Sequence, residues 1–334
     1  MTVTQAPAPA DAPPRPRPKA VSYLRLGKAR MYHYVYGWAL GVLLLRADGL
    51  VNGGRTSLTL VLMLAGTLAI QWSASAADDV SGFLNGSDVQ NYAGRPPVTR
   101  VRKPLLTGAL TVSEAVRFAV VTWVAGMLAI ALSAGFLEWR VPGPALVVAL
   151  GVPVLAVQYS CGLKLSYRPL GLETTIFFTG AYTVVAPYWF VAGRVSREAL
   201  LVGALVGLWL LLVVSYGNAS DRAGDAAVLR RTLAVILRPP WFSVVVHLLV
   251  AAHAVLLVLL FTTTRLSQAL LVVGAPVAAL QLAQLYYGMH RGELRKARFL
   301  VLISIDLGFA GLATALLAGS PGSAGLAGLA EITP

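Results

Sequence analysis

Long apolar segments dominate the sequence and restrict the chain to folds that a lipid bilayer can accommodate. A bilayer-spanning helix needs about 20 consecutive, mainly apolar residues, and the sequence contains nine segments of this kind. Backbone polar groups inside a bilayer must be hydrogen-bonded within the protein, which favours helices. We therefore predict an all-α integral membrane protein with nine transmembrane helices. The predicted spans are residues 31–50, 57–77, 112–134, 143–160, 172–193, 198–217, 241–262, 266–287 and 299–318.

The charged residues support this class and indicate a topology. Only 12% of the residues are charged, whereas about a quarter are charged in soluble domains. Of the 27 Lys and Arg residues, 20 lie before the first span or in every second connection, and the opposite side holds six, counting Arg46 near the end of the first span. Cytoplasmic connections are enriched in Lys and Arg, so the N-terminus is predicted to be cytoplasmic and the C-terminus outside. The net charge of +13 thus follows a membrane topology, and we expect no nucleic-acid partner.

The composition also predicts where the membrane domain begins and ends. Residues 1–24 are rich in Pro, Ala and Arg and are expected to form a disordered tail. A single membrane domain is expected over residues 25–320, followed by a flexible tail at 321–334. The single cysteine, Cys161, excludes an internal disulfide and a cysteine-based metal site. Arg outnumbers Lys by 22 to 5 and Ala and Gly are frequent, which suggests a bacterial plasma membrane.

Acidic and amide side chains gather at the end of the sixth predicted span. Asn218, Asp221 and Asp225 stand at positions i, i+3 and i+7, so a continued helix would carry all three on one face. Ionisable residues at membrane depth are costly and are functional by default. This face is therefore a candidate binding site.

A second group of oxygen-bearing side chains closes the second predicted span. If the helix continues through them, Asp78, Ser81, Asn85 and Asp88 stand at i, i+3, i+7 and i+10 and share one face, with Asp79 beside them. Carboxylate and amide oxygens without His or Cys suit a hard cation such as Mg²⁺, which also binds phosphate oxygens. The simpler interpretation is a set of solvated helix-end acids, but two such rows favour one Mg²⁺-diphosphate site. Its predicted metal ligands are Asp78, Asp79, Asn85, Asp88, Asn218, Asp221 and Asp225.

Basic residues follow each acidic group and have a matching chemical task. A departing diphosphate accumulates negative charge, which Arg or Lys side chains stabilise. The connections of any membrane protein are basic on the cytoplasmic side, so each residue alone is a weak signal. The candidates are Lys103, Lys164, Arg168, Arg222, Arg230 and Arg231. All except Arg230 are assigned to diphosphate binding, with Lys164 and Arg222 preferred.

The second acidic group resembles a motif of the UbiA superfamily of membrane prenyltransferases. Tyr216 to Asp225 reads Y-G-N-A-S-D-R-A-G-D and continues to an R-R-T-L run at 230–233, whereas the family carries D-x-x-D-x-x-G-D before a similar run. Asn218 occupies the first Asp position of that motif, and Asp221 and Asp225 occupy the others. By this resemblance Asp221, Asp225 and Asp79 are the residues expected to be catalytic.

The first acidic group departs further from the family pattern N-D-x-x-D-x-x-x-D. Asp78 replaces the Asn, Asp79 matches the first Asp, Gly82 stands where the second Asp is expected, and Asp88 lies two positions beyond the third. Downstream, the segment 102–108 resembles the family's R-P-L-x-x-G, with Lys103 in place of Arg. Residues 159–171 are similar to the connection between the fourth and fifth helices in the quinone and chlorophyll-type branches.

The resemblance implies a helical bundle around a central cavity in which Mg²⁺ binds a polyprenyl diphosphate. Ionisation would leave an allylic cation that a lipophilic, usually aromatic, acceptor attacks. Aromatic rings stabilise such a cation, and Tyr36, Trp72 and Tyr182 are the candidates chosen from the aromatic residues of the first, second and fifth spans. Asp306, in the last span, is interpreted as a structural acid rather than a base.

Two other functions remain open. In a terpene cyclase on the same scaffold, the ionised prenyl chain would attack itself and no acceptor would be needed. The altered first motif and Asn218 give this hypothesis additional weight. A transporter or lipid-binding protein could instead use the acids to couple cations.

Overall fold

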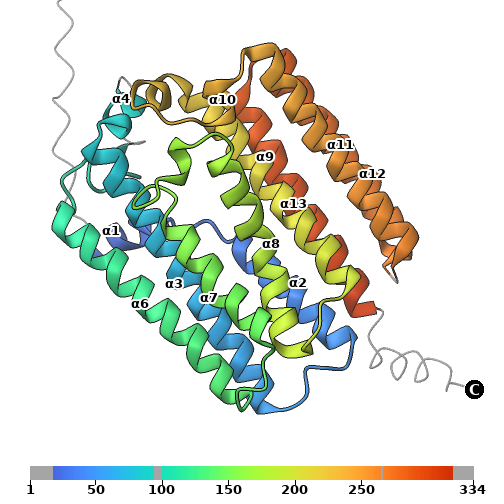
Figure 1. The fold of residues 1–334 in the computed structure, drawn as a ribbon. Helices are drawn as coiled ribbons and strands as arrows, with labels where there is room; N and C mark the ends of the chain where they lie inside the picture. Colours follow the sequence, from blue (N-terminus) through green and yellow to red (C-terminus); the bar gives the residue numbers. More distant parts are fainter. Residues whose placement is uncertain (1–17, 94–99, 265, 319–334) are drawn as a thin grey trace, which may run out of the picture.

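A computed structural model of the chain describes residues 18–93, 100–264 and 266–318. Within these ranges all regular secondary structure is helical (Figure 1), which confirms the predicted all-α class. Residues 1–17 of the predicted N-terminal tail and all of 321–334 lie outside the described residues. Helix α1 (Lys19–Leu26) begins inside the segment expected to be a tail. Its last residue, Leu26, is fully buried in a cluster with side chains of two longer helices, which explains the order there.

Each of the nine predicted apolar segments contains a helix, but six described helices are long and apolar enough to cross a membrane. Helices α2 (His33–Ala47) and α7 (Gly143–Val157) have 15 residues each, or about 22 Å of helix, less than a hydrocarbon core of about 30 Å. The count of nine spans is therefore not confirmed, although the chain is a multi-pass membrane protein. The six are α3 (Gly54–Leu84), α6 (Val112–Phe136), α8 (Gly171–Ala192), α9 (Arg197–Ala227), α11 (Pro239–Thr263) and α13 (Leu294–Ala318).

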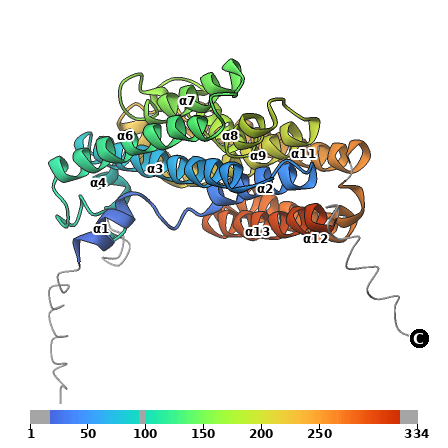
Figure 2. The same cartoon turned by 90° about the horizontal axis from the view of Figure 1, so that it is seen from below.

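Helix α9 is the centre of the bundle. In its most apolar window 78% of the residues are buried, against 22% in α6 and 28% in α11. It packs against α8, α13 and α11. In Figures 1 and 2, α6 lies at one edge of the molecule and the pair formed by α11 and α12 (Ser267–Leu285) lies at the other.

Glycines set the closest approaches between the helices. A Cβ atom on Gly180 of α8 would lie 2.9 Å from the Cα atom of Gly207 in α9. A Cβ atom on Gly66 of α3 would likewise lie 2.9 Å from the carbonyl oxygen of Gly126 in α6. Small residues allow helices in membranes to pack backbone against backbone. These contacts hold α3 against α6 and α9 against α8.

Helices α3 and α9 each continue for 31 residues, beyond the ends of their predicted apolar segments. Their final turns carry the acidic residues to the same end of the bundle. Short elements cover this end (Figure 1): α4 (Ser87–Tyr92), the 3₁₀ turn η1 (Leu165–Tyr167) and α10 (Leu233–Ile236). A π-helical segment, η2 (Tyr286–His290), precedes α13.

Candidate active site

The two acidic groups face one cavity of about 310 Å³ at this end of the bundle. Side chains of α2, α3, α4, α7, α8, α9 and α13 line it, together with residues of the connecting segments. Its deeper walls are formed by Ile70, Val152 and Tyr182, and its polar mouth by the acids and by basic residues. The cavity therefore joins an apolar wall to a charged rim, as a ligand with an apolar tail and an anionic head requires.

The row on α9 is arranged as its spacing predicts. Because the helix runs without a break to Ala227, Asn218, Asp221 and Asp225 share a face and all three line the cavity. Asp225 is buried, with 3% of its surface exposed. One wall of the cavity thus carries three oxygen-bearing side chains.

The row on α3 is interrupted. Gly86 adopts a left-handed conformation with φ of 83°, which ends α3 after Leu84 and starts α4 in a new direction. Asp78 remains on α3 and lines the cavity, and Asp88 reaches the cavity from α4. Asp79 lies behind them and is 1% exposed. The expectation that one continuous helix carries residues 78 to 88 is wrong, because a glycine turn separates them.

Asp88 nevertheless lies where the family pattern expects a carboxylate. A Cβ atom added to Gly82 would meet the carboxylate of Asp88, with Cγ and Oδ2 both at 2.9 Å. The side chain that Gly82 lacks is thus replaced in space by the side chain of Asp88. Because α4 turns back toward α3, a residue six positions later in the sequence occupies this place.

Asn85 is not brought to the cavity. Its side chain is exposed, its amide Nδ2 donates a hydrogen bond to the Tyr167 hydroxyl at 2.6 Å, and its Oδ1 accepts one from the backbone N–H of Ser87 at 2.9 Å. It holds the turn between α3 and α4. The structure therefore gives no support to its predicted role as a metal ligand.

Three cations, Lys103, Lys28 and Arg230, bridge the carboxylates. The Nζ atom of Lys103 lies 2.8 Å from Asp79 Oδ1 and 2.9 Å from Asp88 Oδ2. The Nζ atom of Lys28 lies 3.2 Å from Asp78 Oδ2.

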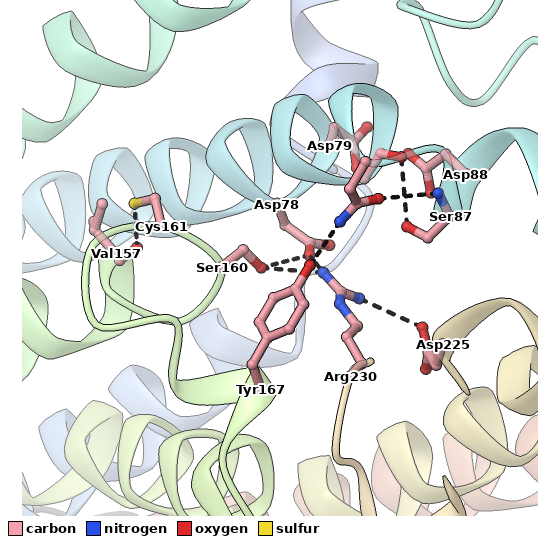
Figure 3. A network of polar contacts seen from close by, with 12 residues as sticks. Asp78, Asp79, Ser87, Asp88, Val157, Ser160, Cys161, Tyr167, Asp225 and Arg230 are labelled. Atoms are coloured by element: carbon pink, nitrogen blue, oxygen red, sulfur yellow. Dashed lines mark hydrogen bonds and ion pairs between the residues drawn. The ribbon is translucent and has the colours of Figure 1, made fainter. Parts of the chain in front are cut away.

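The third cation, Arg230, connects the two rows. Its Nη2 donates to Asp78 Oδ1 at 2.6 Å and to Ser160 Oγ at 3.2 Å, and its Nη1 lies 3.7 Å from Asp225 Oδ1 (Figure 3). Its guanidinium also lies 5.9 Å from the ring centre of Tyr159. One side chain thus contacts an acid of α3 and an acid of α9.

The acids keep the bridging cations charged. Burial lowers the pKa of Lys103, but the carboxylates of Asp79, Asp88 and Asp78 together outweigh it and raise the pKa above its usual range. Burial acts on Arg230 in the same direction, and Asp78 and Asp225 again more than offset it, so the pKa of Arg230 is also raised. Both side chains therefore present positive charge to the cavity at any physiological pH.

Most of the basic residues assigned from the sequence lie elsewhere. Lys164, Arg168 and Arg231 are exposed and are not among the described residues that line the cavity. Arg222 donates a hydrogen bond to the backbone carbonyl of Leu237 at 2.9 Å and braces the connection after α9. Of the five assigned residues, only Lys103 lines the cavity.

Backbone geometry decides between Arg230 and Arg231. Leu229 adopts a left-handed conformation with φ of 61°, and the backbone N–H of Arg231 donates to the carbonyl of Ser166 at 3.1 Å. These contacts fix the segment with Arg230 directed inward and Arg231 outward. Arg230 was named as a candidate but was left out of the assigned set.

The aromatic candidates are corrected in a similar way. Tyr182 lines the cavity, and its hydroxyl donates to the carbonyl of Ala149 at 3.0 Å. Tyr36 instead stacks on Phe309 at a centroid distance of 4.0 Å and donates to Asp306 Oδ1 at 3.0 Å. This contact agrees with the structural interpretation of Asp306.

The third aromatic candidate also lies away from the cavity. Trp72 packs near Phe118 and against Gly27. In place of Tyr36 and Trp72, the cavity is lined by Tyr34 and Tyr159. Tyr34 precedes Tyr36 by two residues, and this offset puts them on opposite sides of α2.

Comparison with known proteins decides the family. The model of the UbiA prenyltransferase family matches residues 35–307, which is most of the chain. The chain belongs to the UbiA prenyltransferase family. No curated protein sequence matches it.

Solved structures of UbiA proteins share the fold. An apo UbiA homologue from Aeropyrum pernix K1 superposes with a TM-score of 0.61 at 18% identity, over 86% of this chain and 97% of that one. A UbiA homologue from Archaeoglobus fulgidus, solved with GPP and Mg²⁺, gives 0.59 at 14% identity over 87% and 99%. A digeranylgeranylglyceryl phosphate synthase gives 0.60 at 14% identity over 89% and 98%. The helical bundle is therefore a UbiA fold along almost its whole length.

The donor atoms of this UbiA cavity fit Mg²⁺. Among the described residues, no three acidic, His or Cys side chains form a preformed metal cage. Mg²⁺ seldom needs one, because it keeps several waters and is held by one or two carboxylates together with substrate phosphates. Asp221 and Asp225 on one wall and Asp78 and Asp88 on the other offer such carboxylates.

Several cavity residues carried no signal in the sequence. Lys28 belongs to the segment between α1 and α2, Asn91 to α4, and Arg298 to the first turns of α13. None of these residues belongs to either acidic motif. Only the packing of distant segments at one end of the bundle brings them together. The sequence could have indicated them only as basic or amide residues close to the predicted helix ends.

Proposed function

We propose that this UbiA protein transfers a prenyl group from a prenyl diphosphate to a lipophilic, aromatic acceptor in a Mg²⁺-dependent reaction. The observation that carries the proposal is the arrangement of two acid rows, on α3 with α4 and on α9, around one cavity with Arg230 between them. The Archaeoglobus fulgidus homologue bound to GPP and Mg²⁺ supports the same choice of substrate class.

The residues present suit the bond changes of this reaction. The bond between C1 of the prenyl chain and the diphosphate oxygen breaks, and diphosphate leaves with the electron pair. Mg²⁺ supplies positive charge to the departing oxygens when it is bound, held by Asp221 and Asp225 and by Asp78 and Asp88. Lys103, Lys28 and Arg230 contribute further charge, since their ammonium and guanidinium groups lie at the rim. The acceptor then bonds to C1 and loses a proton.

Aromatic side chains in the cavity suit the allylic cation. Tyr34, Tyr159 and Tyr182 line it, and the electron-rich face of a ring attracts a positive charge, with more effect where water is excluded. The apolar wall formed by Ile70, Val152 and Pro153 offers a surface for the prenyl tail.

The protein is also proposed to have a defined membrane and orientation. A single membrane domain of roughly residues 25–320 would sit in a bacterial plasma membrane with its N-terminus and the active-site end in the cytoplasm and its C-terminus outside. The basic connections at the active-site end support this orientation, since Lys28, Lys103, Arg230 and Arg298 all lie there.

Release of diphosphate tests the proposal. Purified protein is incubated with geranyl diphosphate, Mg²⁺ and a lipid extract as the acceptor source, and released diphosphate is measured with and without a chelator. We expect release that requires Mg²⁺ and that falls at least ~100-fold in Asp221→Asn and Asp225→Asn. Glu293→Gln, which changes an exposed acid in the connection before α13, is the matched control and should keep the wild-type rate.

Two outcomes would favour the other candidate functions. Release without any acceptor, together with a cyclic hydrocarbon product, would make the protein a cyclase. No release with any chain length or acceptor would contradict the enzyme assignment and favour a transporter or lipid-binding role.

A further inference from the structure

Helix α4 lies between the two acid helices and touches both through glycines. It packs against α3 and α9. Asp88 of α4 fills the space beside Gly82 of α3, and Asn91 of α4 fills the space beside Gly224 of α9. A Cβ atom on Gly224 would lie 2.0 Å from Asn91 Oδ1, so any side chain at position 224 would displace the Asn91 carboxamide. Residues 88 and 91 are three positions apart and so share one face of the short helix.

The side chain of Asn91 is poised to bind a ligand. It lines the cavity, and within the described residues its carboxamide has no hydrogen-bond partner, unlike Lys28, Lys103 and Arg230, which each contact a carboxylate at 3.2 Å or less. An amide at the edge of a cavity that lacks a protein partner can exchange its water for a ligand at little cost. Asn91 is therefore available to a ligand without first breaking a contact.

The chemistry of the surroundings selects the ligand group. The oxygens on both walls are mainly carboxylate, which attract metal ions and repel phosphates. An amide carries N–H donors and no charge, so it can approach a phosphate oxygen among acids where a further carboxylate could not. Gly224 has the corresponding task of leaving room for this amide.

We propose that Asn91 binds the diphosphate of the substrate by donating an amide hydrogen bond, and that position 224 is glycine to admit the Asn91 side chain. This inference rests on the proposed function, because it assumes a diphosphate in the cavity. It adds a binding residue from α4, outside the two acidic motifs, and a reason for the glycine in the second motif.

Calorimetric titration of the full-length protein with inorganic diphosphate in the presence of Mg²⁺ tests the inference. We expect the Kd of Asn91→Ala to rise about tenfold, as for loss of one hydrogen bond to a charged group. Asn91→Asp keeps the size of the side chain but replaces the donor with a charge, and its Kd should rise further. Gln90→Ala, at an exposed neighbour on the same helix, should bind as the wild type does.

A double mutant separates binding from packing. Gly224→Ala should displace the Asn91 amide and raise the Kd as much as Asn91→Ala does. Combined with Asn91→Ala it should add nothing, because the space is then empty. Thermal unfolding of each variant shows whether it is folded.

The outcomes distinguish a failure of this inference from a failure of the proposed function. If the wild type binds diphosphate and Asn91→Asp binds it equally well, Asn91 only packs against Gly224 and the inference is overturned. Additive effects of Gly224→Ala and Asn91→Ala would overturn the role given to Gly224. If the wild type binds no diphosphate with Mg²⁺, the proposed function itself fails and the inference fails with it.

Discussion

Replacement of Arg230 by Met should remove the side chain that joins the two acid rows while keeping its approximate length. Arg230 makes one short contact with Asp78 at 2.6 Å and a longer one with Asp225 at 3.7 Å, and its side chain is 11% exposed. A buried hydrogen bond between charged groups contributes about 1.5–3 kcal/mol. With the weaker second contact included, we expect the substitution to remove about 2–4 kcal/mol of interaction free energy.

If Arg230 makes contacts of this strength with the departing diphosphate in the transition state, their loss lowers the rate about 30-fold to about 900-fold. The assay is Mg²⁺-dependent release of diphosphate from geranyl diphosphate at saturating substrate. Arg231→Met is the matched control, since Arg231 is the adjacent residue and is exposed, and its rate should change less than about twofold.

The comparison between neighbours is what makes this experiment decisive. Equal rates for Arg230→Met and the wild type would refute the bridging role of Arg230. A loss in Arg231→Met as large as in Arg230→Met would show that the segment after α9 has another conformation during turnover. A thermal unfolding curve for each variant separates loss of the fold from loss of the chemistry.

Two further outcomes follow from the packing. Asp88→Gly should lower Mg²⁺-dependent activity. Adding Gly82→Asp should restore part of the lost activity, because side chains at positions 82 and 88 occupy the same space. A double variant no more active than Asp88→Gly would show that a carboxylate on α3 cannot replace the one on α4. Gly180→Ala should destabilise the fold by about 1–3 kcal/mol, measured by thermal unfolding, because its Cβ would lie 2.9 Å from Gly207. The exposed Gly135→Ala, whose Cβ would meet nothing within 4 Å, should be neutral or stabilising, and equal effects at the two sites would contradict the packing argument.

Elements that depend on local sequence pattern were predictable. The apolar segments became helices because backbone groups in a bilayer must be paired internally. The row of Asn218, Asp221 and Asp225 was predictable because helix periodicity alone places i, i+3 and i+7 on one face. Position 79 was matched by the family pattern, although its side chain is held by Lys103 behind the cavity wall.

Features that depend on a single backbone turn or on tertiary packing were not predictable. Gly86 broke the helix between Asp79 and Asp88, and only the fold returned Asp88 to Gly82. Choosing Arg230 over Arg231 required the conformation of Leu229, which no pattern of charges encodes. Helical periodicity therefore does not predict which face a side chain occupies beyond a glycine turn or a residue in the left-handed conformation.

The prediction of which aromatic residues line the cavity was partly wrong for a related reason. Tyr34 and Tyr36 lie on the same helix, and which one faces the cavity depends on how α2 is rotated against α8 and α13. Hydrophobic composition does not specify this rotation, since α2 is apolar on most of its surface. The cavity lining was therefore recognisable only from the assembled bundle.

Product identification tests the transferase proposal most directly. Purified protein is incubated with isotope-labelled geranyl diphosphate, Mg²⁺ and a panel of lipophilic aromatic acceptors, and the products are analysed by mass spectrometry, with Asp221→Asn as the inactive control. We expect an acceptor carrying the labelled prenyl group together with free diphosphate, and neither product from the control. A labelled cyclic hydrocarbon formed without acceptor, or an unchanged substrate under every condition, would contradict prenyl transfer as the function of this protein.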